Sequence, residues 1–474
     1  MTSNISISKD CRGWRMLVEM GRDPLNFFVN LMIKYGAYVW LRIKGRNVVL
    51  LSDATGIEHV LQSKSDNYCK GYFHKILKPL FGRSVFLVEG ESWRNQRRNA
   101  APVFSNKNYP EIVYQVVCAV QAMLHRWEEK VEQEEPIDIA LEMTGFTFDA
   151  LLRALFHEAR DDIALNMRST LDVILGDAES RMWSYYRPPV WITHRLPRYR
   201  RAQKFLSRIV EELIEARLTN NAYPEDVLSR LISYFGKSPS EQSTRQYEIL
   251  SYLLAGHDTT AHGLSWAIYC MGLHTDVQLK VNAEAERVLT SSPITFEKIK
   301  ELEYTHRVFE EALRLYPPVW TMSRQAINDD EIPLDSGASL FVPSGTAIMM
   351  CQYAVHRRKQ YWPHPEAFEP DRFLVSGDRP QYAWFPFGGG PRVCLGARFS
   401  QIEASIALSM ITQRYELSLL PGQNIKPHPI ITLRPSGKML FAVKKRPPKT
   451  QEVASYVPAE QIAAQICPFQ HASR

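Results

Sequence analysis

The sequence predicts a mainly α protein with small β-sheets (α+β), because three stretches of the chain show different patterns. Between about residues 57 and 289, apolar residues recur three and four positions apart with charges between them, which is the period of amphipathic helices. From Pro317 onward, ten prolines within some 75 residues exclude long helices and separate short apolar runs. Apolar and mixed residues alternate over 39–43, a Gly45-Arg46-Asn47 turn follows, and the apolar run 48–51 comes next. This pattern indicates a hairpin near the N-terminus.

Local patterns predict the remaining elements. The apolar stretch 250–270 predicts one long helix, and the amphipathic, breaker-free stretch 397–411 predicts another. Short apolar runs predict strands at 340–342, 347–350, 430–433 and 439–443. The chain shows no internal repeat and no linker. We therefore expect a single domain over residues 1–446, followed by a polar, flexible tail over 447–474.

Composition narrows the class of protein. The 474 residues are 45% hydrophobic and 23% charged, which is the balance of a globular protein. Lys and Arg exceed Asp and Glu by 57 to 51, and this excess of 6 is too small and too evenly spread for a nucleic-acid binder. No stretch reaches the roughly 18 apolar residues of a membrane helix, so we expect no integral membrane anchor and a cytoplasmic location.

Seven cysteines lie at least 43 positions apart, which excludes a local zinc motif and favours reduced thiols. One of them, Cys394, ends a glycine-rich segment at 385–396 and precedes the helix predicted at 397–411. Backbone N–H groups and the dipole at a helix N-terminus favour a thiolate. Two interpretations follow, an inert structural cysteine beside a flexible loop or a single thiolate ligand to a metal whose other ligands belong to a cofactor.

A resemblance favours the second interpretation. The pattern F-x-x-G-x-R-x-C-x-G, filled by Phe387, Gly390, Arg392, Cys394 and Gly396, resembles the heme-binding signature of the cytochrome P450 family. The resemblance implies heme b (iron protoporphyrin IX) with Cys394 as its axial ligand and metal-binding residue, and Phe387 beside it. It also implies the cytochrome P450 fold, in which a long central helix crosses over a buried heme.

Within the long predicted helix, the segment 255–260 reads A-G-H-D-T-T, and Asp258 is the only formally charged residue between 249 and 270. Burying an acid on such an apolar helix costs free energy, so we expect the acid to have a charged or hydrogen-bonding partner or a functional role. The segment resembles the oxygen-activation motif of the same family. The resemblance implies that Gly256 leaves room for dioxygen, that Thr259 hydrogen-bonds the reduced oxygen and that Asp258 relays protons from solvent.

Arginines are expected to hold the two heme propionates, because a guanidinium binds a carboxylate through two hydrogen bonds. The family pattern W-x-x-x-R nominates Trp93 and Arg97, and Arg324 and Arg392 are the other candidates. The pattern E-x-x-R is filled by Glu311 and Arg314. Together with Arg372, these two are expected to form a structural network that holds the cysteine loop.

The resemblance spans residues 25–446 and implies a soluble, bacterial-type heme-thiolate monooxygenase that uses O2 to hydroxylate or epoxidise a hydrophobic substrate, such as a fatty acid or terpenoid. Only 28 residues follow Arg446, so two electrons must come from an external ferredoxin or flavodoxin and its reductase. A heme-thiolate isomerase or dehydratase that needs no O2, and a non-catalytic heme-binding protein, are the alternatives. By analogy, the substrate pocket is expected to be lined by residues 70–88, the neighbourhood of 177–197, 254–259, 319–323 and 430–433. These stretches supply the bulky residues Tyr72, Phe73, Phe86, Trp183, Trp320, Met322 and Ile431.

Overall fold

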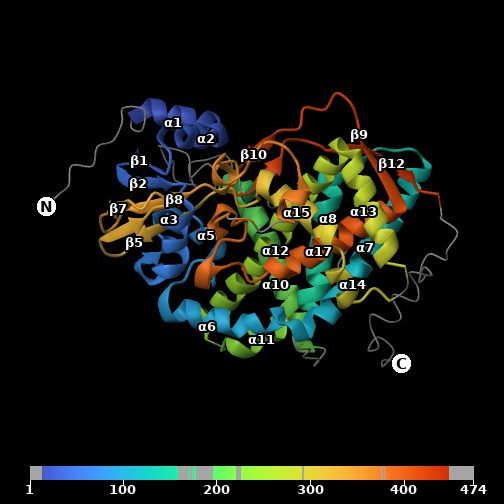
Figure 1. Cartoon of the computed structure of the whole chain (residues 1–474). Helices are drawn as coiled ribbons and strands as arrows, with labels where there is room; N and C mark the ends of the chain where they lie inside the picture. The colour runs from blue at the N-terminus through green and yellow to red at the C-terminus, as the bar shows by residue number, and fades with distance from the viewer. Residues whose placement is uncertain are drawn as a thin grey trace.

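The computed structural model describes residues 13–158, 196–219, 226–236, 238–290, 293–374 and 379–447, together with positions 170, 173, 174, 176, 177 and 377. The predicted tail therefore lies outside the described residues, apart from Pro447. The structure is mainly α with small β-sheets, as the sequence predicts. The helices gather at one end of the molecule and the largest sheet lies at the other (Figure 1).

The described α-helices include short single turns as well as long core helices. In chain order they are α1 (Gly13–Arg22), α2 (Pro24–Tyr35), α3 (Ala54–Glu58), α4 (Tyr72–Lys75), α5 (Lys78–Phe81), α6 (Gly90–Ala100), α7 (Tyr109–Glu132), α8 (Ile139–Phe156), α10 (Leu196–Thr219), α11 (Val227–Tyr234), α12 (Pro239–Leu273), α13 (Thr275–Val288), α14 (Phe296–Lys300), α15 (Glu303–Leu315), α16 (Gln352–Val355) and α17 (Ala397–Arg414).

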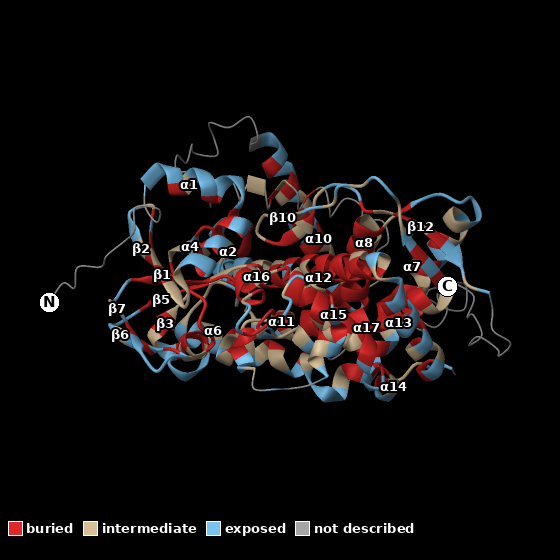
Figure 2. Cartoon of the chain, turned by 45° about the horizontal axis from the view of Figure 1, so that its top comes forward, coloured by how far each residue is buried: buried red, intermediate tan, exposed pale blue. Residues whose placement is uncertain are grey.

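The long central helix is confirmed and is longer than its apolar stretch indicates. α12 starts eleven residues before position 250 because Ser238 caps it, accepting a hydrogen bond from the Glu241 N–H, and Pro239 occupies its first turn. It packs most closely on α8, and also on α15 and α17. These helices form the buried centre of the molecule (Figure 2). α12 is thus a rigid support on which a site can be built.

The strands form four small sheets. They are β1 (Tyr38–Ile43), β2 (Arg46–Leu51), β3 (Tyr68–Cys69), β4 (Ile137–Asp138), β5 (Met322–Ala326), β6 (Asp330–Pro333), β7 (Ser339–Val342), β8 (Ala347–Met350), β9 (Tyr415–Leu419), β10 (Pro427–Pro429), β11 (Leu433–Pro435) and β12 (Leu440–Lys445). The largest sheet has the order β1-β2-β8-β5-β3, and the smaller ones are β4-β12-β9, β6-β7 and β10-β11.

The predicted N-terminal hairpin is confirmed as β1 and β2, but it does not stand alone. β2 pairs in parallel with β8, with Val48 opposite Ala347, so the hairpin joins strands from the proline-rich region in one sheet. The strand predicted at 430–433 is wrong. Residues 430–432 form a bend between β10 and β11, in which the Ile430 N–H donates to the His428 and Thr432 carbonyls. The apolar run there faces a cavity instead of continuing a strand.

No helix in the described part of the chain combines the length and the apolar character that crossing a membrane requires.

Candidate active site

A cavity of about 470 Å³ lies between the middle of α12, the start of α6, strand β5 and the loop before α17. Its volume falls within the range of small-molecule sites. Every residue that the sequence nominates for catalysis or cofactor binding lines it: Trp93, Arg97, Gly256, Asp258, Thr259, Arg324, Phe387, Arg392 and Cys394. Four segments far apart in the sequence therefore meet at one site.

Tight backbone turns position the cysteine loop, residues 385–396. The Cys394 N–H donates to the Phe387 carbonyl at 3.0 Å, which folds the loop back on itself. Gly390 has φ +61°, and a Cβ there would lie 1.9 Å from the Leu61 carbonyl oxygen in the one-turn helix η2 (His59–Ser63). Only glycine permits this approach. The Cys394 side chain is exposed to the cavity as a result.

The helix after the cysteine begins where the sequence predicts it, at Ala397, with Gly396 as its cap. The helix start acts in the expected direction, because the Gly396 N–H lowers the pKa of the Cys394 thiol and the Arg97 charge lowers it further. Burial is the larger effect and raises that pKa. A metal ion deprotonates a coordinating thiol outright.

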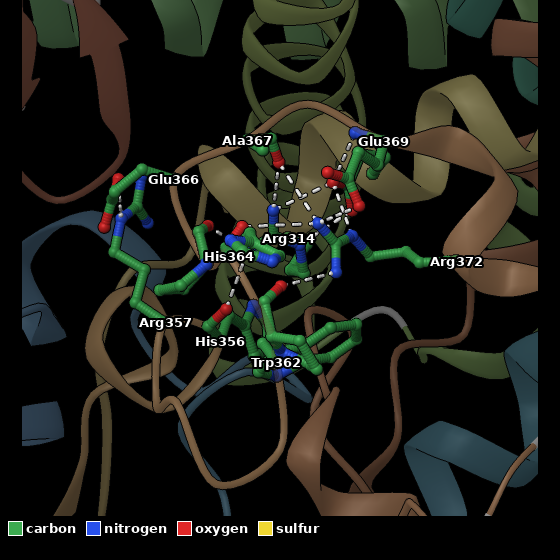
Figure 3. A network of polar contacts seen from close by, with 12 residues as sticks. Arg314, His356, Arg357, Trp362, His364, Glu366, Ala367, Glu369 and Arg372 are labelled. Carbon is green, nitrogen blue, oxygen red and sulfur yellow. Dashed lines mark hydrogen bonds and ion pairs between the residues drawn. The ribbon is translucent and has the colours of Figure 1, made fainter.

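The network that the sequence predicts from the E-x-x-R pattern is confirmed (Figure 3). Arg314 donates to both carboxylate oxygens of Glu311 at 2.7 and 2.8 Å, and Arg372 Nε donates to Glu311 at 2.9 Å. Arg314 also donates to the His356 carbonyl, and His356 Nε2 accepts from the Phe385 N–H at 3.0 Å. The network therefore reaches the first residue of the cysteine loop and holds it in place.

One end of the cavity is rich in cations. Trp93 lies between two guanidinium groups, 5.8 Å from Arg97 and 5.3 Å from Arg392. Arg97 donates to the Val393 carbonyl at 2.8 Å, beside the cysteine. Arg392 already has a carboxylate partner, since its Nη2 lies 2.7 Å from Glu89 Oε2. Its Nε is buried and has no hydrogen-bond partner among the described residues.

The electrostatics of this end favour an anionic group. Arg324 is 5% exposed, and its burial, followed by the field of Arg392, lowers its pKa to about 10. Burial likewise lowers the pKa of Lys70 to about 7. Glu89, which is partly exposed, pairs with Arg392 and also acts on Lys70 and Arg324, and the buried Glu248 acts on Lys70 as well. Buried cations of this kind are stable when an anion neutralises them. The two propionates of heme b fit that requirement, and Cys394 faces the same cavity.

The α12 residues differ from one another in orientation. Thr259 faces the cavity, and its hydroxyl donates to the Ala255 carbonyl at 2.8 Å. Gly256 lines the cavity as expected, but a Cβ there would lie 2.5 Å from Leu151 Cδ1. The glycine therefore allows α8 to pack closely against α12, and its expected role of leaving room for dioxygen stays a prediction.

Asp258 is held by other side chains. Its Oδ2 accepts a hydrogen bond from the Thr432 hydroxyl at 2.8 Å, and its Oδ1 lies 3.2 Å from His262 Nε2 and 3.7 Å from Arg434 Nη2. Burial raises the pKa of Asp258, but the charges of His262 and Arg434 outweigh burial and hold that pKa well below its usual range. The carboxyl is therefore ionised at neutral pH.

The predicted substrate pocket is confirmed in part. Phe86, Trp320, Met322 and Ile431 line the cavity, whereas Tyr72 packs under the Arg46 guanidinium, 4.3 Å from its ring centre. Trp183 and the side chain of Phe73 lie outside the described residues. The lining is mostly apolar, which suits a hydrophobic substrate.

Some lining residues give no signal in the sequence. Leu151 and Leu155 of α8 form part of the wall and are not expected there from the sequence, whereas Lys70 and His74, at the cationic end, belong to the stretch 70–88 that the resemblance assigns to the pocket. Burial, and then the charge of Arg324, lowers the pKa of His74 to about 3, so this side chain is a neutral polar contact. None of the four belongs to a motif. Their roles follow from the way α4, α8 and α12 pack, which local patterns do not show.

The fold and this cavity define a heme-thiolate protein, in which one cysteine faces a largely apolar cavity lined by a long helix. The chain belongs to the cytochrome P450 family, since the model of that family, "Cytochrome P450", matches residues 12–442. Members of the family bind heme b through an axial cysteine thiolate and act as monooxygenases.

Named relatives come from plants, bacteria and mammals. The chain is 29% identical to the chloroplastic carotene epsilon-monooxygenase of Arabidopsis thaliana, over 88% of this chain and 81% of the relative. It is 28% identical to the cyclooctatin synthase of Streptomyces melanosporofaciens, over 87% and 90% of the two chains. It is also 28% identical to cytochrome P450 4A6 of Oryctolagus cuniculus, over 81% and 79%. The bacterial-type assignment stays a prediction.

Proposed function

We propose that Cys394 is the axial ligand of heme b and that the enzyme uses O2 to hydroxylate or epoxidise a hydrophobic substrate in the cavity above it. One observation carries the proposal. The only cysteine that lines the described cavity faces the same space as Thr259 and Asp258 of the central helix. When bound, heme b supplies the iron centre at which O2 is reduced and activated.

The residues of the chain bind the cofactor and control water and protons. Arg97, Arg324 and Arg392 would hold the propionates, and Gly388, which lines the cavity, lets the cysteine loop approach the cofactor without a Cβ. The Thr259 hydroxyl donates its hydrogen bond to the Ala255 carbonyl. Its oxygen can therefore accept a hydrogen bond from a group bound in the cavity. Thr259 thus orients a proton donor, and the apolar lining excludes bulk water.

The two alternatives are less well supported. A heme-thiolate isomerase or dehydratase works without O2 and needs neither a hydroxyl nor an acid on the central helix. A non-catalytic heme protein needs no pocket for a second molecule. Thr259, Asp258 and a largely apolar chamber in one cavity favour O2-dependent turnover of a bound substrate.

For the substrate, we propose a fatty acid or a terpenoid, because the lining is apolar and because one relative is named a carotene monooxygenase. For the electron donor, we propose an external ferredoxin or flavodoxin with its reductase. The exposed Arg94, together with Arg97, Arg98 and Arg398, supplies a basic surface that attracts an acidic donor. The cytoplasmic location stays a prediction.

Thr259→Ala tests the role of the central helix. With NADPH, a surrogate ferredoxin and its reductase, and dodecanoate or β-carotene as probe substrates, we expect the variant to bind heme and substrate normally. It should release hydrogen peroxide in place of product. Ser265→Ala is the matched control, because the Ser265 hydroxyl donates to the Ala261 carbonyl on the same helix but does not line the described cavity. An unchanged product yield per NADPH in Thr259→Ala contradicts the proposed role.

A further inference from the structure

His74 lies on the single-turn helix α4, which packs against strand β5 at the cationic end of the cavity. The same strand carries Arg324. Among the histidines in the described part of the chain, His74 is the only one that lines the cavity. No motif nominates this residue, and the proposed function gives it no role. Its imidazole is thus a polar group at the site whose purpose has to be inferred from its surroundings.

The two ring nitrogens of His74 lie in different surroundings. Nδ1 is buried with no hydrogen-bond partner among the described residues. Nε2 makes no hydrogen bond to a described residue either, but it is not one of the buried atoms. Nitrogens without a partner also occur in His257, His262 and His356, which do not line the cavity. What distinguishes His74 is therefore an unbonded nitrogen that a molecule in the cavity can reach.

The surroundings of His74 keep its imidazole neutral. Burial lowers its pKa to about 3, and the charges of Arg324, Lys70 and Arg392 act in the same direction. None of the groups in the described structure that shift this pKa is an acid. At neutral pH the ring therefore carries one N–H group and one lone pair. It can donate a hydrogen bond without adding a positive charge to a cluster that already holds several.

The cluster around His74 has more hydrogen-bond donors than acceptors. Lys70 Nζ donates to two backbone carbonyls, which leaves one of its three N–H groups. Arg324 donates to one carbonyl, and Arg392 Nε is buried without a partner in the described structure. The acid that contacts the cluster, Glu89, already accepts from Arg392 Nη2 and from the Lys70 backbone N–H. The cluster therefore fits a ligand that brings negative charge and several oxygen acceptors, which is the chemistry of a carboxylate.

We infer that His74 is a further cofactor-binding residue, which donates a hydrogen bond from Nε2 to a propionate of heme b. The inference rests on the proposed function, in which Arg97, Arg324 and Arg392 hold the same carboxylates. A neutral donor suits this position, because the arginines already supply the positive charge and a further buried cation is costly. His74 thus helps to retain the cofactor and to orient one propionate.

A fatty-acid substrate also carries a carboxylate, so two sources share this chemistry. The propionate is favoured because the groups that act on His74 include Arg324 and Arg392, the two arginines that the proposed function assigns to the propionates. The two sources differ in when the hydrogen bond exists. A bond to the propionate is present in the substrate-free holoenzyme, whereas a bond to a substrate appears only after dodecanoate is added.

His74→Leu tests the inference, because leucine is apolar and has no N–H group. The ferric, substrate-free holoenzyme is studied by resonance Raman spectroscopy, in which the bending band of the propionates responds to their hydrogen bonds. We expect this band to shift in His74→Leu. Transfer of heme to an excess of apomyoglobin should be roughly tenfold faster than from the wild type, which is the effect of losing one hydrogen bond to a charged group.

Two further variants separate the hydrogen bond from other effects of the substitution. His74→Gln keeps an N–H group at about the position of imidazole Nε2, so it should restore the band and slow the loss of heme. His306→Leu is the matched control, because burial lowers the pKa of His306 to about 4 and so leaves a second neutral imidazole. His306 lies on α15 and does not line the cavity. Its variant should keep the wild-type band and the wild-type rate of heme loss.

An unshifted propionate band in His74→Leu overturns the inference, even if heme is lost faster, because a merely structural role also gives faster loss. An unshifted band together with weaker dodecanoate binding, measured by the change in spin state, assigns the hydrogen bond to the substrate and overturns it as well. His74→Phe, which also lacks an N–H group, replaces the leucine variant if that variant yields no holoenzyme. A wild type that lacks the red-shifted Soret band of a thiolate-bound carbonyl complex instead overturns the proposed function, so the two failures are distinguishable.

Discussion

Two buried ion clusters lie in this enzyme, and they differ in how completely their polar atoms are used. On the cysteine side of the site, Arg314 donates five hydrogen bonds, to Glu311 and to three carbonyl oxygens. On the opposite side, Asp258 accepts a hydrogen bond from Thr432 and lies within ion-pair distance of His262 and Arg434, while both ring nitrogens of His262 are buried without a hydrogen-bond partner among the described residues.

This difference separates a structural cluster from a functional one. A fully satisfied buried network has one low-energy arrangement and therefore fixes the backbone around it. The cluster around Asp258 has buried polar atoms without hydrogen bonds, so less of the free-energy cost of burying them is offset. The first cluster connects to the cysteine loop through His356, and the second lies on the cavity wall.

The largest expected effect comes from breaking the satisfied cluster. Arg314→Ala leaves Glu311 buried and removes the contact with the His356 carbonyl, so the cysteine loop loses its anchor. Removal of one partner from a buried ion pair costs about 3–5 kcal/mol. Urea unfolding should show this loss, together with low heme content in the purified protein.

The control for that variant is a surface ion pair. Lys445 and Glu132 lie 2.9 Å apart, but their side chains are 47% and 67% exposed. Lys445→Gln should therefore cost no more than about 1 kcal/mol and should leave the heme content unchanged. Equal losses in Arg314→Ala and Lys445→Gln count against the structural role of the buried network.

The second effect concerns the cluster on the cavity wall. Asp258→Asn keeps the hydrogen bond with Thr432 but removes the acid, so it should lower NADPH-driven turnover by about 100-fold, a typical loss for a missing acid–base group. Heme content and the carbonyl spectrum should stay as in the wild type. If Asp258→Asn instead resembles Arg314→Ala, with heme lost and the fold weakened, the two clusters do not differ in the proposed way.

A third and smaller effect comes from Glu403 on α17, a buried carboxyl with no hydrogen-bond partner in the described structure. Burial raises its pKa well above the usual range. The folded protein therefore holds a proton that the unfolded chain releases above about pH 4.3, and stability falls as pH rises, by up to about 1.4 kcal/mol per pH unit.

Glu403→Gln should remove this slope between about pH 5 and 8, because the amide does not titrate. The free energy of unfolding, measured for both proteins across that range, checks the expectation. Parallel curves for the wild type and Glu403→Gln would mean that Glu403 is paired in solution.

Much of the fold and of the site can be predicted from local patterns. The long apolar stretch around Asp258 predicts α12, and the glycine-rich segment before Cys394 predicts a loop at a helix start. The five fixed positions around Cys394 lead to the family and so to the expected cofactor. These signals are short in sequence, and each depends on residues close to one another.

The features that the sequence does not predict depend on contacts between residues far apart in the chain. Nothing near position 48 indicates a parallel partner at 347, and nothing near Lys70 places its side chain at the cationic end of the cavity. The bend at 430–432 reads as a strand because its residues are apolar and β-branched, but tertiary contacts of Thr432 and Leu433 with α12 decide its shape. Such contacts override local propensity.

The central claim is that Cys394 supplies the thiolate to heme b, and the absorption spectrum of the dithionite-reduced, CO-bound protein tests it most directly. The wild type should show the strongly red-shifted Soret band of thiolate ligation, and Cys394→Ala should lose it. Cys69→Ala is the matched control, because Cys69 is half-buried and its thiol contacts the Gln325 carbonyl. Loss of the band in Cys394→Ala alone is the predicted result, and a band that survives in Cys394→Ala contradicts the account.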